Sequence, residues 1–180
     1  SAASDVYKRQ ALRILGAYAA LVYAMPLLGG IVSDRYLGQT KAVKLGGILL
    51  VLGHCAMAFE GIPATQGIAG EVVRDDQAIT VFYFALALIV VGVGLLKPNI
   101  STVVGRLYGE NDQRRDGGFT IFYMGINIGA ASASLLCGWL ASAYGWAYGF
   151  GAAGIGMLIG LIVFSPVSYT HLRAHETQSD

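Results

Sequence analysis

The stretch ITVFYFALALIVVGVGLLKPNISTVVGRLY, residues 79–108, decides the fold of this chain. Its first eighteen residues carry no charged side chain. A bilayer core is spanned by about 20 predominantly apolar residues in a helix, and helices satisfy their own backbone hydrogen bonds in lipid. We therefore expect this tract to be a membrane-spanning α-helix, and its extra length predicts tilt or an end that protrudes from the bilayer.

One charged residue, Lys97, follows directly on the longest uncharged part of this tract. A lysine within a span costs about 2.5–3.5 kcal/mol on insertion scales, so it usually faces a polar cavity and marks a substrate or proton path. The alternative is that the long side chain of Lys97 snorkels to the nearer interface. The helix-compatible pattern continues to Tyr108, which favours a cavity.

The composition indicates a membrane protein. The chain is 55% hydrophobic and only 13% charged, and its mean hydropathy is +0.59, whereas globular domains contain about 25% charged residues. The two cysteines, Cys55 and Cys137, lie singly in apolar stretches, which predicts free thiols and no disulfide or metal site.

Four more apolar tracts resemble the first in length and composition. We expect an all-α membrane protein with five transmembrane helices, at residues 12–32, 42–59, 79–108, 119–144 and 147–164. Glycine pairs lie within them, which predicts close contacts between helices. These pairs are Gly46 and Gly47, Gly92 and Gly94, Gly125 and Gly129, and Gly156 and Gly160.

The loops differ in basic residues, and this difference predicts the orientation. The loops after the first and third spans, SDRYLGQTK (33–41) and GENDQRRDGG (109–118), are flanked by or contain six basic residues. These are Arg35, Lys41, Lys44, Arg106, Arg114 and Arg115. The loop after the second span, residues 61–77, contains Arg74 alone. Since loops rich in basic residues stay in the cytoplasm, we expect the loops at 33–41 and 109–118 to be cytoplasmic.

Both ends differ from the apolar pattern. Residues 1–10 and 167–180 are polar, lack periodicity and resemble translated sequencing-adapter sequence, notably SDVYKRQ and SYTHLRAHET. We expect both to be non-native and exclude them from the functional interpretation. The transmembrane bundle then comprises residues 11–166, and we expect the chain to be a fragment.

The turn after the first span reads GGIVSDRYLG, residues 29–38. Asp34 can cap a partner helix, Arg35 can form an ion pair across a bundle, and Gly30 and Gly38 permit close approach. This pattern resembles the cytoplasmic loop signature of the major facilitator superfamily, which implies a gate between two halves of a transporter. The alternative is a solvated turn that only sets topology.

Two further motifs narrow the resemblance. LLKPNISTVVGRLY (95–108) and FTIFYMGINIG (119–129) are similar to those of proton-dependent oligopeptide transporters, particularly bacterial members. The resemblance implies that the five spans are helices two to six of a twelve-helix or larger protein, a partial N-terminal six-helix bundle. The first helix and the C-terminal half would then lie outside this chain. One departure is Gln39, which stands where that family has a basic residue.

The same resemblance implies roles for three residues. Lys97 matches a lysine associated with proton coupling and with the carboxylate of the bound peptide. Asn127 matches an asparagine that hydrogen-bonds the peptide backbone, and Tyr23 matches a tyrosine of the binding cavity. A cation, an amide and a phenol suit a ligand with a carboxylate and peptide groups. Alternatively, Tyr23 is a packed aromatic and Asn127 an interhelical hydrogen-bonding residue.

The function implied is proton-coupled symport of di- and tripeptides by alternating access, by a multi-pass protein of the cell inner membrane. The partners are peptides, protons, the lipid bilayer and the missing C-terminal half. The alternatives are a major facilitator for another small solute and a non-transporting membrane scaffold. The sequence carries no pattern typical of an enzyme, a metal or cofactor site, or nucleic-acid binding.

We expect this chain by itself not to transport peptide, because half of the cavity wall would be missing. Uptake of labelled dialanine into liposomes that contain only this chain is the measurement. Accumulation above the level in empty liposomes would contradict the expectation.

Overall fold

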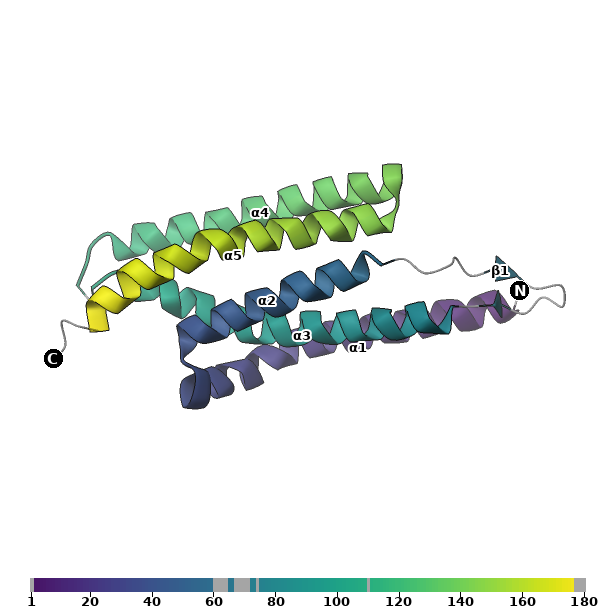
Figure 1. The fold of residues 1–180 in the computed structure, drawn as a ribbon, viewed down its shortest axis with the longest axis horizontal. Coiled ribbons are helices and arrows are strands. Elements are labelled where there is room, and N and C mark those ends of the chain that lie inside the picture. Colours follow the sequence, from purple (N-terminus) through teal and green to yellow (C-terminus); the bar gives the residue numbers. More distant parts are fainter. Residues whose placement is uncertain (1, 60–64, 67–71, 74, 110, 177–180) are drawn as a thin grey trace.

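The computed structural model describes residues 2–59, 65–66, 72–73, 75–109 and 111–176. It is a bundle of five long helices, drawn in Figure 1. The helices are α1 (Ala2–Val32), α2 (Gln39–Met57), α3 (Asp76–Gly105), α4 (Arg115–Tyr144) and α5 (Trp146–Glu176), and the π-helical turn η1 (Ser33–Leu37) follows α1. Two short strands, β1 (Thr65–Gln66) and β2 (Val72–Val73), pair antiparallel between α2 and α3.

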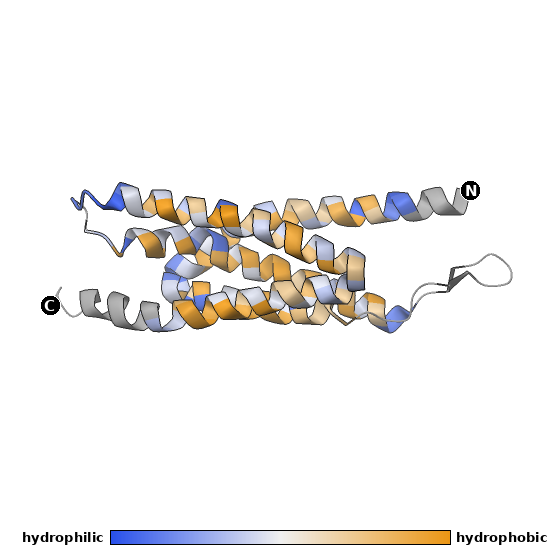
Figure 2. Ribbon diagram, turned by 90° about the horizontal axis from the view of Figure 1, so that it is seen from above, coloured by the Kyte–Doolittle hydropathy of each residue, from blue (hydrophilic) through white to orange (hydrophobic). Residues whose placement is uncertain are grey.

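All five helices are long and apolar enough to cross a membrane, as predicted. The candidate spans are Lys8–Leu37, Gln39–Met57, Asp76–Gly105, Arg115–Tyr144 and Trp146–Pro166. Figure 2 shows hydrophobic residues along the helices and many of the most hydrophilic ones at their ends. The chain is therefore a multi-pass α-helical membrane protein.

Local chemistry explains where the helices begin and end. The Asp75 carboxylate accepts hydrogen bonds from the backbone N–H groups of Gln77 and Ala78, each at 3.1 Å, and so caps the start of α3. Gly38 has a φ of 72° and Gly145 a φ of 112°, conformations that favour glycine. These two glycines permit the sharp reversals from α1 to α2 and from α4 to α5.

The observed helices differ from the expected spans mainly at their ends. Capping by Asp75 starts α3 three residues earlier than the apolar pattern indicates. At the chain ends, α1 begins at Ala2 and α5 continues through Pro166 to Glu176, so both helices extend into residues 1–10 and 167–180. The non-native origin of these ends stays a prediction, as does the boundary of the bundle at residues 11–166. Most of the loop at 61–77, including Arg74, lies outside the described residues.

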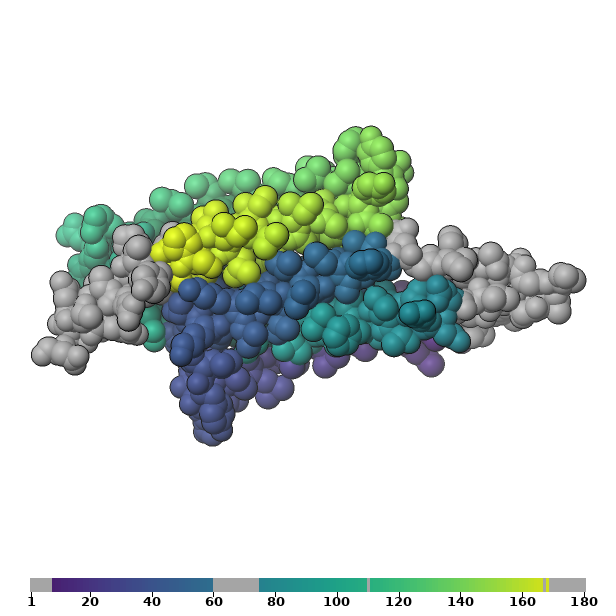
Figure 3. Space-filling model, in the orientation of Figure 1, coloured from purple at the N-terminus to yellow at the C-terminus, as the bar shows by residue number. Residues whose placement is uncertain are grey.

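The best packed part of the bundle is formed by α1, α2 and α3. Contacts are most extensive between α2 and α3 and between α1 and α3, and α5 packs on α2 and α4. Among the residues whose side chains the structure describes, the buried apolar ones all come from α2 and α3. They are Ala42, Val43, Leu50, Ala85, Ile89, Val90, Leu95 and Val103. In contrast, α4 has no buried residue. Figure 3 shows α5 lying along α2, with α4 behind it.

Glycines bring α2 and α3 together, as predicted for Gly46 and Gly92. A Cβ at Gly46 would lie 2.7 Å from the carbonyl oxygen of Gly92, so neither position has room for a side chain. At Gly125, Gly129, Gly156 and Gly160 the predicted close contact is not found, because an added Cβ would meet no atom of a neighbouring helix within 4 Å in the described structure. Helix α5 instead approaches its neighbours at Gly149 and Gly154.

The two loops with many basic residues lie at the same end of the bundle. In Figure 1 the turn η1 and the α3–α4 loop are on the left, whereas the end of α2, the start of α3 and the α4–α5 connection are on the right. Within the α3–α4 loop, hydrogen bonds from the Arg114 side chain and backbone hold the pKa of Asp112 below its usual value. This arrangement agrees with the predicted shared cytoplasmic location of the two loops.

We predict that residue 75 is periplasmic and residue 115 is cytoplasmic. In a protein without Cys55 and Cys137, a cysteine at 75 should react with a membrane-impermeant maleimide in intact cells. A cysteine at 115, or at the exposed Gln113 of the same loop, should react only after lysis. The opposite labelling pattern would invert the orientation.

We also predict that Gly46→Ala destabilises the 180-residue chain by about 1–3 kcal/mol, the usual cost of overpacking. Its Cβ would lie 2.7 Å from one backbone atom and 2.8 Å from another. Gly16→Ala is the matched control, because a Cβ at Gly16 would meet no atom of a neighbouring helix within 4 Å in the described structure. Unfolding in detergent, followed by circular dichroism, compares the two. Equal stabilities would show that the α2–α3 contact does not need a glycine.

Candidate functional site

Lys97 and Tyr23 lie together between α3 and α1. The ammonium nitrogen of Lys97 is 5.1 Å from the centroid of the Tyr23 ring. This distance is within the range of a cation–π interaction, in which the electron-rich face of the ring attracts the charge. Both side chains are exposed in this chain, Tyr23 by 76%. The sequence predicted both as ligand-binding residues, and the structure makes them neighbours.

Lys97 lies well inside α3, which ends eight residues later at Gly105. At about 1.5 Å per residue, the Cα of Lys97 is roughly 12 Å from that end. Its side chain leans toward the Tyr23 ring on α1. Among the described residues, no carboxylate forms an ion pair with the Lys97 ammonium. The arrangement offers a cation beside an aromatic ring, which suits an anionic group of a ligand.

The next residue, Pro98, explains why α1 approaches α3 so closely here. A proline has no N–H, so the backbone hydrogen bond to the carbonyl of Gly94 is missing. Gly29 of α1 packs against this carbonyl, and a Cβ at Gly29 would overlap its oxygen. One turn further along α3, the Cβ of Pro98 would lie 4.0 Å from a Cβ added at Gly30, the residue after Gly29. Close contacts of this kind permit weak Cα–H···O hydrogen bonds between membrane helices.

The predicted gating residues form the turn η1 and its two flanks. Asp34 and Arg35 are both exposed, and Asp34 accepts a long hydrogen bond of 3.4 Å from the Gln39 amide. Gly38 needs its positive φ to end the turn, and its N–H donates to the carbonyl of Ser33 at 2.8 Å. The charged pair thus projects from a well-defined turn. The gating role itself stays a prediction.

Asn127, the third predicted ligand-binding residue, is apart from the other two. It lies on α4, whose contacts are chiefly with α5, and its amide donates to the Tyr123 carbonyl at 3.0 Å. Among the described residues, no hydrogen bond joins Asn127 to Lys97 or Tyr23. The structure therefore brings together two of the three residues predicted to bind ligand.

The sequence analysis missed a buried hydrogen bond close to Lys97. Ser33 at the start of η1 donates to the side-chain oxygen of Asn99 at 2.7 Å, although the two residues are 66 positions apart. Both residues occur in the motifs quoted from the sequence. The available signal was a polar asparagine inside a span, two residues after Lys97.

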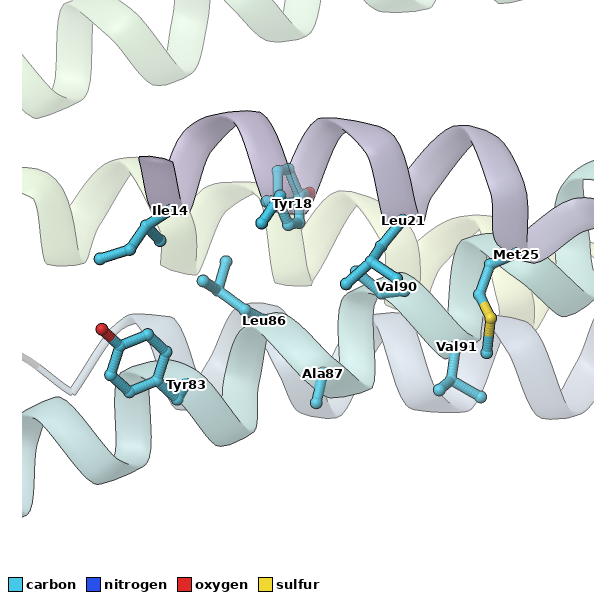
Figure 4. Close-up of a pocket in the computed structure, with 10 residues that line it drawn as sticks. Ile14, Tyr18, Leu21, Met25, Tyr83, Leu86, Ala87, Val90 and Val91 are labelled. Carbon is cyan, nitrogen blue, oxygen red and sulfur yellow. The ribbon is translucent and has the colours of Figure 1, made fainter. Parts of the chain in front are cut away.

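An apolar groove of about 380 Å³ runs between α1 and α3. Figure 4 shows Ile14, Tyr18 and Leu21 of α1 above Leu86 and Val90 of α3. Met25, the lining residue of α1 furthest along the chain, precedes the Gly29–Gly94 contact. Neither Lys97 nor Tyr23 lines this groove. Its walls carry few polar atoms, so it offers nothing to recognise a charged ligand.

Three curated bacterial proteins are similar to this chain. An "Uncharacterized transporter YclF" of Bacillus subtilis is 46% identical over 88% of the chain, and the match covers 29% of that protein. A "Peptide transporter YePEPT" of Yersinia enterocolitica is 40% identical over 95% of the chain and 31% of that protein. A "Di-/tripeptide transporter" of Lactococcus lactis is 41% identical over 87% of the chain and 28% of that protein. The chain thus spans less than a third of the length of these relatives.

Two solved structures show the same helix arrangement. A peptide transporter POT in complex with sulfate is 42% identical, with a TM-score of 0.78 over 90% of this chain and 30% of the other. A POT family transporter in complex with 5-aminolevulinic acid is 36% identical, with a TM-score of 0.68 over 83% of this chain and 27% of the other. The predicted fold, an all-α partial bundle of the major facilitator type, is confirmed.

The family comparison agrees with the motifs. The model of the POT family matches residues 40–178, which include the Lys97 and Asn127 motifs. The relatives are named as transporters and not as enzymes. The chain belongs to the POT family, the peptide transporter family that its motifs resemble.

Proposed function

We propose that this chain is part of a proton-coupled symporter for di- and tripeptides in the inner membrane. In such a transporter two helical halves rock about a binding site near the middle of the membrane. The relatives named as peptide and di-/tripeptide transporters support the substrate class. The chain would contribute helices of the N-terminal half, and other segments of the transporter would complete the cavity.

The observation that carries the proposal is the pairing of Lys97 with Tyr23. A lysine inside a membrane span is energetically costly, so where one occurs it usually has a function. The Tyr23 ring lies 5.1 Å from its ammonium and helps to stabilise the charge without neutralising it. The ammonium then remains available to a peptide carboxylate. Such an interaction recognises the end of the peptide and not its side chains, which suits a transporter for many short peptides.

The proposed proton coupling rests on the chemistry of lysine. A lysine can exist in charged and neutral forms, whereas arginine remains charged at any accessible pH. The proposal is that a peptide carboxylate and a proton both interact with Lys97, so that binding of the peptide changes how readily Lys97 holds its proton. Asn127 would contact the peptide backbone from α4 once the cavity is complete.

The second candidate function is transport of another small solute on the same scaffold. One POT family structure with a TM-score of 0.68 contains 5-aminolevulinic acid, which is not a peptide. That molecule carries a carboxylate and an amine, as a dipeptide does. Competition between 5-aminolevulinic acid and dialanine for uptake distinguishes the two candidates.

We predict that Lys97→Ala and Lys97→Arg both abolish uptake driven by a pH gradient. The test protein is the Yersinia enterocolitica peptide transporter in which residues 11–166 of this chain replace the matching segment. The alanine variant lacks the cation, and the arginine variant cannot release its proton. Accumulation of labelled dialanine in liposomes with an imposed pH gradient is the measurement.

Lys41→Ala is the matched control, because it removes an exposed lysine at the start of α2. It should accumulate dialanine at the parent rate, and all variants should insert and elute from a sizing column like the parent. If either Lys97 variant accumulated dipeptide against its gradient at the parent rate, Lys97 would not be the coupling residue.

A further inference from the structure

Ser33 and Asn99 form a buried polar contact between the start of η1, which directly continues α1, and α3. Ser33 is fully buried and Asn99 is 2% exposed. The Ser33 hydroxyl donates to Asn99 Oδ1 at 2.7 Å. Buried polar groups are costly unless hydrogen-bonded, and more so in an apolar environment. A contact between two such groups therefore fixes the register of the two helices far more narrowly than apolar packing does.

The surrounding hydrogen bonds orient both side chains. Asn99 donates its amide N–H to the carbonyl of Leu95 at 2.7 Å, which leaves Oδ1 facing Ser33. The Ser33 hydroxyl also lies 2.8 Å from the carbonyl of Gly30, so its single proton has two possible acceptors. Ser33 therefore keeps a partner on its own helix if Asn99 moves away. The bond between the helices can open without leaving the serine unsatisfied.

The contact joins two places that the proposed function needs to act together. Ser33 is the first residue of η1 and directly precedes Asp34 and Arg35. On the other side, Asn99 follows Lys97 with only Pro98 between them. Because Pro98 removes one backbone hydrogen bond from α3, this part of the helix depends more on lateral support.

We propose that Ser33 and Asn99 are positioning residues, whose hydrogen bond holds the Lys97 segment of α3 in register with the Asp34–Arg35 turn. A change at Lys97 is then transmitted to the turn through Asn99 and Ser33. The role of this link in transport rests on the proposed function. The link between Lys97 and the turn is independent of that function, and it can be measured without a peptide.

The test is a double-mutant cycle in the 180-residue chain, reconstituted in nanodiscs. Cys55 and Cys137 are replaced by alanine, and Tyr36→Cys, 80% exposed in η1, reports on the turn by its rate of maleimide labelling. Lys97→Gln should change this rate by at least about threefold, within the range of couplings measured between interacting residues. In the presence of Ser33→Ala, Lys97→Gln should change it by less than about 1.5-fold.

Two further variants separate the link from a general structural effect. Asn99→Leu removes the acceptor but leaves the Ser33 hydroxyl bonded to the Gly30 carbonyl. This variant should suppress the Lys97→Gln effect as strongly as Ser33→Ala does. It also replaces Ser33→Ala in the cycle if that variant does not fold. Ser101→Ala is the matched control, since it removes another hydroxyl from α3, one that hydrogen-bonds to the Pro98 carbonyl of its own helix. It should leave the Lys97→Gln effect intact.

The inference is overturned if Lys97→Gln has no effect on labelling in the parent. It is also overturned if that effect keeps its full size with Ser33→Ala or Asn99→Leu. A merely structural contact would change the baseline rate and leave the Lys97→Gln effect unaltered.

A transport arm uses the chimaeric Yersinia transporter. Ser33→Ala and Asn99→Leu should lower the maximum rate of gradient-driven dialanine uptake about tenfold, with a KM for counterflow within about twofold of the parent. An unchanged maximum rate in both variants would overturn the role in transport. If the parent chimaera carries no peptide, the proposed function fails, while the labelling cycle still decides the link.

Discussion

The close approach of α1 to α3 is the constraint on which the candidate site depends. Pro98 leaves the Gly94 carbonyl without its usual helical donor, and Gly29 has no side chain to keep α1 away from it. In lipid there is no water to compensate an unpaired carbonyl, so a neighbouring helix must cover it. A proline on one helix and a glycine on the other thus set the position of α1. The Lys97–Tyr23 pair and the Ser33–Asn99 bond both form across this contact.

The length and polarity of the apolar tracts were enough to predict five transmembrane helices, because a membrane span is recognisable from one continuous stretch of sequence without knowledge of its neighbours. Helix ends were predicted less well, since they depend on local capping such as that by Asp75. The glycines of α2 and α3 were correctly predicted to pack, whereas Gly125 and Gly129 on α4 were not found in contact. Glycine spacing shows where two helices are able to approach, but not whether a second helix is there.

The candidate site was predicted in part, and mainly from family motifs. Lys97 was identifiable from physics alone, as a charge within a span. The nearness of Tyr23 depends on the register of α1 against α3, which no local pattern encodes. The Ser33–Asn99 bond was missed for the same reason, because its partners are 66 positions apart. Asn127 was predicted to share the site, but its helix α4 packs chiefly on α5 and touches α3 only slightly, so packing within the described chain does not fix Asn127 beside Lys97.

The two parts of the bundle differ in how firmly they are packed, and this difference has a mechanical consequence. Close glycine contacts join α1, α2 and α3, and all the buried apolar residues of the described chain belong to α2 and α3. Helix α4 has no buried residue and contacts mainly α5. Lys97, Tyr23 and the turn η1 all belong to the firmly packed part. The proposed link from Lys97 to the turn thus lies within this firmly packed part, whereas Asn127 lies outside it, on a helix that packs chiefly on α5.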